Sequence, residues 1–283
     1  MADKIWISGA NGRLGSKLQE VLDPLEVKIL ATDIDTLDIT DPEAVNVFAD
    51  INRPHAIINC SGITDAEYCE LHPEEAFRVN GLGARNLAVA SRRVNAKLLH
   101  LSTDDVFSGD TERAYREYDP PRPQTVYGKS KLFGEDMVKQ FAKYFFIVRS
   151  SWLYGVRNQV VEDMIKEAEE TGKVIVPIGQ YASPTSTDEL SEFILKLLST
   201  TEYGIYHAMC RGNCSRAEFA RTILRFAGID AEVVKDTDHP LHKLRPANCV
   251  MDNFILRISG LHEFSEWEDA LKEYMTKHNL IAK

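Results

Sequence analysis

A tyrosine and a lysine four residues apart, Tyr127 and Lys131, have the types and the spacing needed for proton transfer. A separation of four places two side chains on the same face of a helix. Tyrosine has a pKa of about 10, too high for a proton relay at neutral pH, and a neighbouring ammonium group lowers it. We therefore expect Lys131 to lower the pKa of the Tyr127 phenol. The alternative is a surface pair that caps a turn between a strand and a helix.

A glycine-rich segment, G-A-N-G-R-L-G at residues 9–15, follows the first predicted strand and opens a helix. Glycine lets the backbone approach a phosphate closely, and a helix N-terminus offers N–H donors and the positive end of the helix dipole. The spacing therefore predicts a turn that binds the pyrophosphate of a dinucleotide. The residues expected to contact the cofactor there are Gly9, Asn11, Gly12, Arg13, Leu14 and Gly15.

Two residues give opposite indications about which dinucleotide binds. Asp33 follows the second predicted strand, where a carboxylate accepts hydrogen bonds from ribose hydroxyls and repels a 2′-phosphate, which favours NAD. Arg13 could pair with that phosphate, or could be a solvated cation of the first helical turn. The choice between NADH and NADPH therefore stays open. Asp38 and Ile39 could flank the adenine, although an ordinary helix-entry loop explains them equally well.

The elements that must position these residues alternate between strand and helix. Apolar patterns predict strands at 4–8, 27–32, 55–60, 97–103 and 144–151. Helices are predicted between them, including 74–90 and 128–142, and Asp41 is expected to cap one that starts at Pro42. This order predicts an α/β fold with a Rossmann-type, doubly wound parallel sheet. In that sheet Tyr127 approaches the carboxyl end of the fourth strand, where Thr103 would hydrogen-bond a reacting oxygen next to the nicotinamide.

The second half has a looser pattern, with helices predicted at 160–171, 187–199 and 216–227, a strand at 174–177 and an extended segment at 204–210. We expect residues 1–155 to form the dinucleotide-binding domain, rejoined by about 183–205. Residues 156–283 are expected to form a smaller, discontinuous C-terminal lobe that binds substrate. Ser215 with Glu218, and Ser265 with Glu268, are predicted to be capping boxes of two helices in this lobe.

Composition excludes several classes of protein. The 283 residues carry 43 acidic and 33 basic side chains, a net charge of −10, without a long basic cluster, which argues against a nucleic acid partner. No apolar leader or membrane-length run is present, so a cytoplasmic protein without a membrane partner is expected. The five cysteines form no C-x-x-C pair and are interpreted as reduced thiols. No H-E-x-x-H motif occurs, and no metal site is expected.

Further motifs are spread over the chain beyond the glycine segment. They are L-D-I-T-D-P at 37–42, V-N at 79–80, S-T-D at 102–104, Y-G-K-S-K at 127–131, R-S-S-W-L-Y-G at 149–155, S-P-T at 183–185, G-I-Y-H at 204–207 and R-P-A-N at 245–248. On these motifs almost the whole chain resembles the dTDP-4-dehydrorhamnose reductase family of the extended short-chain dehydrogenase/reductases. The last four are more specific than the cofactor signature, because they lie in the part that shapes the sugar-nucleotide pocket.

The resemblance implies an NADPH- or NADH-dependent reductase that acts on a nucleotide sugar. The expected reaction reduces the 4-keto group of dTDP-4-dehydro-L-rhamnose to give dTDP-L-rhamnose for a surface polysaccharide. The implied catalytic residues are Thr103, Tyr127, Lys131 and Asn80. Tyr127 would donate a proton to the forming alkoxide, Lys131 would also hold the nicotinamide ribose, and Asn80 would lie behind Lys131 in a proton relay. The family also makes a homodimer plausible.

The resemblance implies further contacts with both ligands. Cys60, Ser61 and Gly62 stand where the family has an alanine-rich segment, and they are expected to contact the cofactor. The implied substrate contacts are Thr103, Asp104, Asp105, Tyr127, Trp152 and Arg245. Trp152 would line the sugar pocket or fill the core. Arg245 would bind the nucleotide diphosphate or form a surface ion pair.

One departure from the family pattern keeps two alternatives open. Asp105 replaces a tyrosine of the family, so a carboxylate stands near the sugar where an aromatic hydroxyl is usual. The resulting T-D-D resembles the T-D-E of nucleotide-sugar 4,6-dehydratases, so a dehydratase or epimerase of the same superfamily is one alternative. A non-catalytic, dinucleotide-binding regulatory subunit is the other, although the presence of Thr103, Tyr127 and Lys131 favours an enzyme.

Overall fold

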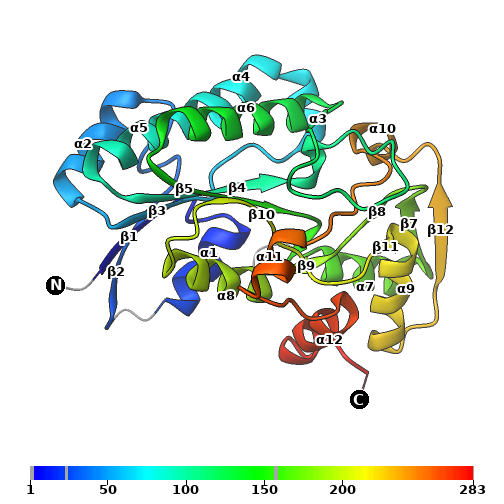
Figure 1. Cartoon of the computed structure of the whole chain (residues 1–283). Helices are drawn as coiled ribbons and strands as arrows, with labels where there is room; N and C mark the ends of the chain where they lie inside the picture. The colour runs from blue at the N-terminus through cyan, green and yellow to red at the C-terminus, as the bar shows by residue number, and fades with distance from the viewer. Residues whose placement is uncertain (1–2, 23–24, 156–158, 283) are drawn as a thin grey trace.

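A six-stranded parallel sheet forms the centre of the molecule (Figure 1). The computed structural model describes residues 3–22, 25–155 and 159–282. In spatial order the strands are β10 (Gly204–His207), β5 (Tyr144–Ser150), β4 (Lys97–Thr103), β3 (Ala56–Asn59), β1 (Asp3–Ser8) and β2 (Val27–Thr32). From β1 the chain passes outward to β2 and then continues on the other side with β3, so the winding reverses between β1 and β3. Ligands of such sheets bind outside the carboxyl ends of the strands at this switch point.

Helices cover both faces of the sheet, which confirms the predicted Rossmann-type α/β fold (Figure 1). One face carries α2 (Pro42–Asn52), α5 (Ala84–Val94) and α6 (Val126–Phe141), and the other carries α1 (Arg13–Val21), α8 (Thr187–Leu198) and α11 (Phe254–Ser259). All four residues of β3 are buried, because alternate side chains enter two different cores. Ile57 joins the core under α2 and α5, and Ile58 joins the core under α1 and α8.

The helix predicted at 74–90 is an irregular helical run. It begins with α4 (Pro73–Phe77), passes through a π-helical segment, η1 (Arg78–Gly83), and continues as α5. Two glycines of η1 allow close packing: a Cβ on Gly81 would lie 2.1 Å from Phe133 Cδ1, and one on Gly83 would lie 2.5 Å from Ile39 Cδ1. The predicted long helix is therefore confirmed, but its π-helical middle is not predicted, because tertiary contacts decide where a helix takes up an extra residue.

The remaining elements lie toward the C-terminus or in short connections (Figure 1). The larger ones are α7 (Val160–Thr171), α9 (Arg216–Ala227), α12 (Trp267–Lys277) and the parallel strands β7 (Lys173–Pro177) and β12 (Glu232–Asp236). The short ones are α3 (Ala66–Leu71), η2 (Asp104–Val106), β6 (Leu153–Tyr154), β8 (Tyr181–Ala182), β9 (Thr185–Ser186), β11 (Cys214–Ser215) and α10 (Leu241–Leu244). The predicted domain boundary adjoins residues 156–158, which lie outside the described residues, and the division into two lobes stays a prediction.

Of the three helix caps predicted from the sequence, two are present in the structure and one is not. Asp41 accepts the N–H groups of Glu43 and Ala44 at the start of α2, as expected. Ser215 and Glu218 form the predicted capping box of α9. The box predicted for Ser265 is wrong, because α12 begins one residue later with Glu266 as its N-cap.

Within the described ranges, no helix has both the length and the apolar character that crossing a bilayer requires.

Candidate active site

A cavity of about 360 Å³ lies where the carboxyl ends of β4 and β5 meet the C-terminal half of the chain. Its wall includes the glycine segment at Gly12, the segment after β3 at Cys60 and Gly62, and the first turn of α6 at Tyr127. Arg216 and Arg245 close it from the C-terminal half. A larger and more open hollow of about 860 Å³, between α3, α4 and α6, contains none of the predicted site residues.

The glycine segment has the close packing that a dinucleotide turn requires. Gly9 has a φ of +73°, and a Cβ there would lie 2.6 Å from the main-chain nitrogen of Ser61. A Cβ on Gly15 would lie 2.2 Å from Gly9 O, so only glycine allows α1 to start this close to β1. Gly12 is the N-cap of α1 and Leu14 is buried in its first turn, so the backbone at this turn can approach a phosphate.

Asp33 and Arg13 point to different places. Asp33 Oδ2 accepts the Asn11 N–H at 2.8 Å, which fixes the carboxylate beside the glycine segment. The Arg13 guanidinium donates instead to Leu153 O at 3.4 Å and to Thr64 Oγ1 at 3.3 Å. It lines the cavity, and burial lowers its pKa. The interpretation of Arg13 as a solvated first-turn cation is therefore wrong.

Two residues expected beside the adenine have structural partners. Ile39 is 6% exposed and packs in the core under α2 and α5. Asp38 accepts the Thr40 N–H at 2.8 Å and shapes the loop before α2. Neither is in the wall of the cavity.

The segment after β3 lies against the glycine segment. Cys60 and Gly62 line the cavity, and the Oγ atoms of Ser61 and Ser8 are 2.5 Å apart. Burial raises the pKa of the Cys60 thiol to about 12, so this group stays protonated at neutral pH.

Tyr127 reaches Thr103 because α6 starts unusually close to η2. The Thr125 side chain caps α6, and a Cβ on Gly128 would lie 2.2 Å from Asp105 O. Glycine at this position therefore lets the first turn of α6 approach the end of β4. Tyr127 and Thr103 are each 6% exposed and both line the cavity, and the Thr103 side chain lies close enough to the phenol to lower its pKa. The structure thus brings together the phenol and the hydroxyl that the sequence analysis paired.

The electrostatics of the phenol differ from the prediction. Burial raises the pKa of Tyr127 above its ordinary value, and Arg245 is the main group that opposes this rise. Lys131 points its ammonium group at Leu101 O, 2.7 Å away, and burial lowers its pKa to about 8. The pKa of Tyr127 is therefore raised and not lowered in the free protein, because burial outweighs the favourable charges around the phenol, and an effect of Lys131 on this pKa stays a prediction.

Asn80 organises the segment after β3. Its Oδ1 accepts the Ile63 N–H at 2.8 Å, while its Nδ2 donates to Ile63 O at 3.0 Å and to Ser130 Oγ at 2.9 Å. A Cβ on Gly62 would lie 2.8 Å from Asn80 Oδ1 and 3.8 Å from Lys131 Nζ. Asn80 therefore lies next to Lys131 and fixes the backbone that passes it.

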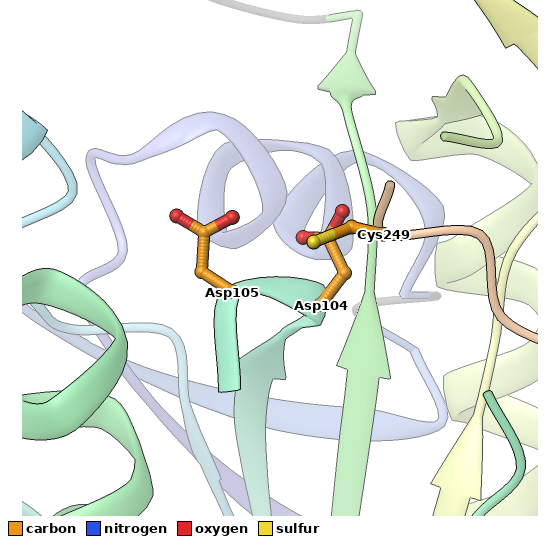
Figure 2. A group of neighbouring side chains, drawn as sticks. All are labelled: Asp104, Asp105 and Cys249. Carbon is orange, nitrogen blue, oxygen red and sulfur yellow. The ribbon is translucent and has the colours of Figure 1, made fainter. Parts of the chain in front are cut away.

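Asp104, Asp105 and Cys249 form a buried group beside the phenol (Figure 2). Their ligand-type atoms lie within 4.8 Å of one another, but both carboxylates already have partners in the protein. Asp104 accepts the hydroxyls of Ser151 at 2.5 Å and Thr103 at 3.0 Å, and Asp105 pairs with Arg245 at 2.5 Å. Burial, followed by repulsion from Asp105, raises the pKa of Asp104 to about 7. This geometry gives no positive argument for a metal ion.

Arg216, which no sequence motif marks as a site residue, forms a wall of the cavity together with Trp152. The guanidinium carbon of Arg216 lies 3.5 Å from the centroid of the Trp152 ring, and burial lowers the Arg216 pKa to about 10. Trp152 lines the cavity with a φ of +38°, an uncommon conformation for a bulky residue. The only sequence signal near Arg216 was the capping box, which is structural.

The buried charge of Lys131 should lower the free energy of unfolding of the protein. Its pKa is about 8 when folded against an ordinary 10.5, so the unfolded chain binds more protons between these values and stability rises with pH across them. We expect Lys131→Met to raise the free energy of unfolding at pH 7 by on the order of 2 kcal/mol, after allowing for the lost hydrogen bond to Leu101. Urea unfolding from pH 7 to pH 10 measures this, and the gain should shrink as the pH rises. A gain that grows with pH would contradict the lowered pKa.

The family model of the RmlD substrate binding domain matches residues 3–280. The chain belongs to this family. The chain is similar to the spore coat polysaccharide biosynthesis protein SpsK of Bacillus subtilis, with 34% identity over 98% of both chains. A dTDP-4-dehydrorhamnose reductase of Streptomyces griseus is 36% identical over 94% of this chain and 91% of its own length. The solved structure of dTDP-4-dehydrorhamnose reductase from Bacillus anthracis in complex with NADP has a TM-score of 0.94 and 38% identity, over 98% of this chain and all of that one.

Proposed function

We propose that this protein is an NAD(P)H-dependent oxidoreductase that reduces the 4-keto group of dTDP-4-dehydro-L-rhamnose to give dTDP-L-rhamnose. The observation that carries the proposal is that Tyr127 and Thr103 lie together in the wall of a cavity that also includes the glycine segment. Full-length similarity to dTDP-4-dehydrorhamnose reductases supports the choice of substrate. Similarity to SpsK, a spore coat polysaccharide protein, supports a product used in a surface polysaccharide.

The cavity fits a nicotinamide dinucleotide. Glycine at position 9 lets the turn pack against the backbone after β3, and the turn leads to Gly12 at the N-terminus of α1, where a pyrophosphate can be bound. Ser150 Oγ, buried in the cavity wall, has no partner among the described residues. When bound, the reduced cofactor supplies a hydride to the carbonyl carbon. In this assignment Asp33 binds the adenosine ribose, and Lys131 lies within reach of the nicotinamide end of the cavity.

Tyr127 and Thr103 act on the carbonyl oxygen of the sugar. The phenol donates its proton to the oxygen as that oxygen becomes an alkoxide, and the Thr103 hydroxyl holds it in place. Both side chains are almost fully buried, so bulk water does not compete for these hydrogen bonds. Asn80 fixes the segment beside Lys131, which is the role that its hydrogen bonds support.

The charges of the cavity wall suit a nucleoside diphosphate sugar. Three guanidinium groups, from Arg13, Arg216 and Arg245, face two carboxylates, from Asp104 and Asp105. An excess of cations in a partly enclosed cavity attracts a diphosphate, and arginine is well suited to bind its oxygens. Trp152 presents an aromatic surface next to Arg216, against which a sugar ring could pack. A homodimer and a cytoplasmic location stay predictions.

The proposal is tested by following the absorbance of reduced nicotinamide. Purified protein is offered 4-keto sugars linked to dTDP, GDP or UDP, with NADPH or with NADH, and the product sugar is identified. We expect one cofactor molecule to be oxidised for each dTDP-L-rhamnose formed. Conversion of a sugar without net oxidation would favour the dehydratase or epimerase alternative, and absence of turnover with every substrate would contradict the reductase.

Asp33 should set the preference between the two cofactors. Its carboxylate is fixed at the end of β2, where it repels a 2′-phosphate, and Arg13 points elsewhere. We expect Asp33→Ser to raise the ratio of kcat/KM for NADPH to that for NADH about tenfold, since one close charge repulsion of about 1.4 kcal/mol is removed. Asp35→Ser, on the same exposed turn, is the matched control and should leave the ratio unchanged. An unchanged ratio in the Asp33 variant would rule out its contact with the ribose.

A further inference from the structure

Arg245 places a cation directly on the ring of Tyr127. Its guanidinium carbon lies 4.7 Å from the ring centroid, its Nη1 is 2.5 Å from Asp105 Oδ2, and its Nη2 donates to Thr64 O at 3.1 Å. The Asp105 side chain is only 5% exposed, and that of Arg245 is 25% exposed. The guanidinium is therefore held between η2, the segment after β3 and the phenol.

Lys131, the cation that the sequence motif pairs with Tyr127, has other partners. It lies one helical turn further along α6 and donates to Leu101 O at 2.7 Å. The titratable groups that interact with its ammonium group include Glu135, Cys60 and His100. The two cations of the site thus have separate positions: Arg245 lies at the Tyr127 ring, and Lys131 lies against the backbone of β4 at Leu101.

We propose that Arg245 is the cation that stabilises the phenolate of Tyr127, and that Asp105 is the residue that positions Arg245. The part that Arg245 plays in turnover rests on the proposed function. In that reaction the carbonyl carbon gains hydride from the reduced nicotinamide, the O–H bond of the phenol breaks, and the O–H bond of the product forms. The negative charge then stays on the phenolate until solvent returns a proton, and a guanidinium at the ring stabilises it.

Other groups around the phenol raise or lower its pKa. The charged or titratable side chains near Tyr127 or Arg245, besides Asp105, include Asp104, Arg13, Arg216, Cys69, Cys249 and Lys131. Burial and the carboxylates of Asp104 and Asp105 raise the phenol pKa, and Arg245 is the largest charge effect that lowers it. Asp105 therefore has two opposing effects: its own charge disfavours the phenolate, and its ion pair keeps Arg245 in place.

The test follows the phenol itself, without substrate. Tyr127 is replaced by 3,5-difluorotyrosine, a more acidic analogue, and its ionisation is followed by ¹⁹F NMR in the full chain as the pH rises. We expect Arg245→Gln to lower the ionisation constant of this phenol about tenfold. Arg245→Lys should restore part of the loss, because it keeps a positive charge. Lys131→Gln should have the smaller effect, and a larger effect of Lys131→Gln than of Arg245→Gln would overturn the assignment of the cation.

The positioning role of Asp105 is measured by repeating Arg245→Gln in an Asp105→Asn background, with Asp105→Ser as a second background should the first fail to fold. If the carboxylate holds the guanidinium in place, Arg245→Gln changes the ionisation constant clearly less there than in the parent protein. The matched control is Asp50→Asn, which breaks an exposed ion pair with Arg93. In that background Arg245→Gln should change the ionisation constant of the phenol as much as it does in the parent protein. An equal effect in the Asp105 background would overturn the positioning role. Because no substrate is used, failure of the reductase proposal leaves this result readable.

Discussion

Replacing the phenol hydroxyl of Tyr127 should lower kcat/KM for the 4-keto sugar by about 10²–10⁴-fold, the usual contribution of a positioned general acid. Tyr127→Phe keeps the ring, which is 6% exposed and packs with Cys69 and Ala76, so the fold should be retained. The variant loses the phenol hydroxyl that lies beside Thr103 in the cavity wall, and with it the proton donor. Steady-state kinetics with saturating cofactor, together with a thermal melt, measure both expectations.

The matched control is Tyr144→Phe, which removes a phenol hydroxyl at the start of β5, at the amino end of the sheet. It should leave kcat/KM unchanged, and both variants should bind reduced cofactor as the parent does. A Tyr127→Phe protein with full activity would exclude the phenol as the proton donor. Full function in the cell combined with no turnover in either protein would instead favour the regulatory-subunit alternative.

Most of the fold is predictable because parallel strands buried on both faces are short apolar runs with clear ends. Strand β4, an internal strand with mostly buried residues, runs from Lys97 to Thr103, the range that the sequence predicts. The edge strand β2 (Val27–Thr32) is more exposed but also matches its predicted range. The helix α3 and the strand β12 are not predicted. Strand β12 is only half-buried or exposed along its length and has no alternating pattern, and its pairing with β7 is a tertiary contact.

The members of the site are largely predictable, but the contacts between them are not. Tyr127, Thr103 and the glycine segment meet because motifs at the carboxyl ends of parallel strands share one edge of the sheet. The Asp105–Arg245 ion pair joins residues 140 positions apart, in a loop whose path no local pattern specifies. Burial, which dominates the phenol pKa, is likewise a property of the folded chain and cannot be read from the Tyr-x-x-x-Lys spacing.

A buried ion pair beneath the site gives the largest expected effect on stability. Glu135 on α6 is fully buried and accepts Arg149 Nε at 2.8 Å, Arg149 Nη2 at 2.7 Å and Ser102 Oγ at 2.6 Å. Arg149 on β5 is 1% exposed. The pair therefore joins α6, which carries Tyr127, to the two strands whose carboxyl ends form the cavity.

Glu135→Gln should lower the free energy of unfolding by about 3–5 kcal/mol, because it leaves the Arg149 guanidinium buried without an opposite charge. Denaturant unfolding at pH 7 measures this loss, and Arg225→Gln, which breaks an exposed ion pair with Glu268, should change the midpoint little. Replacing both partners, as Glu135→Leu with Arg149→Met, should cost less than Glu135→Gln alone, since no unpaired charge remains in the core. A double variant that loses as much stability as the two single variants together would show that the two side chains are not coupled, and would contradict this account of the ion pair.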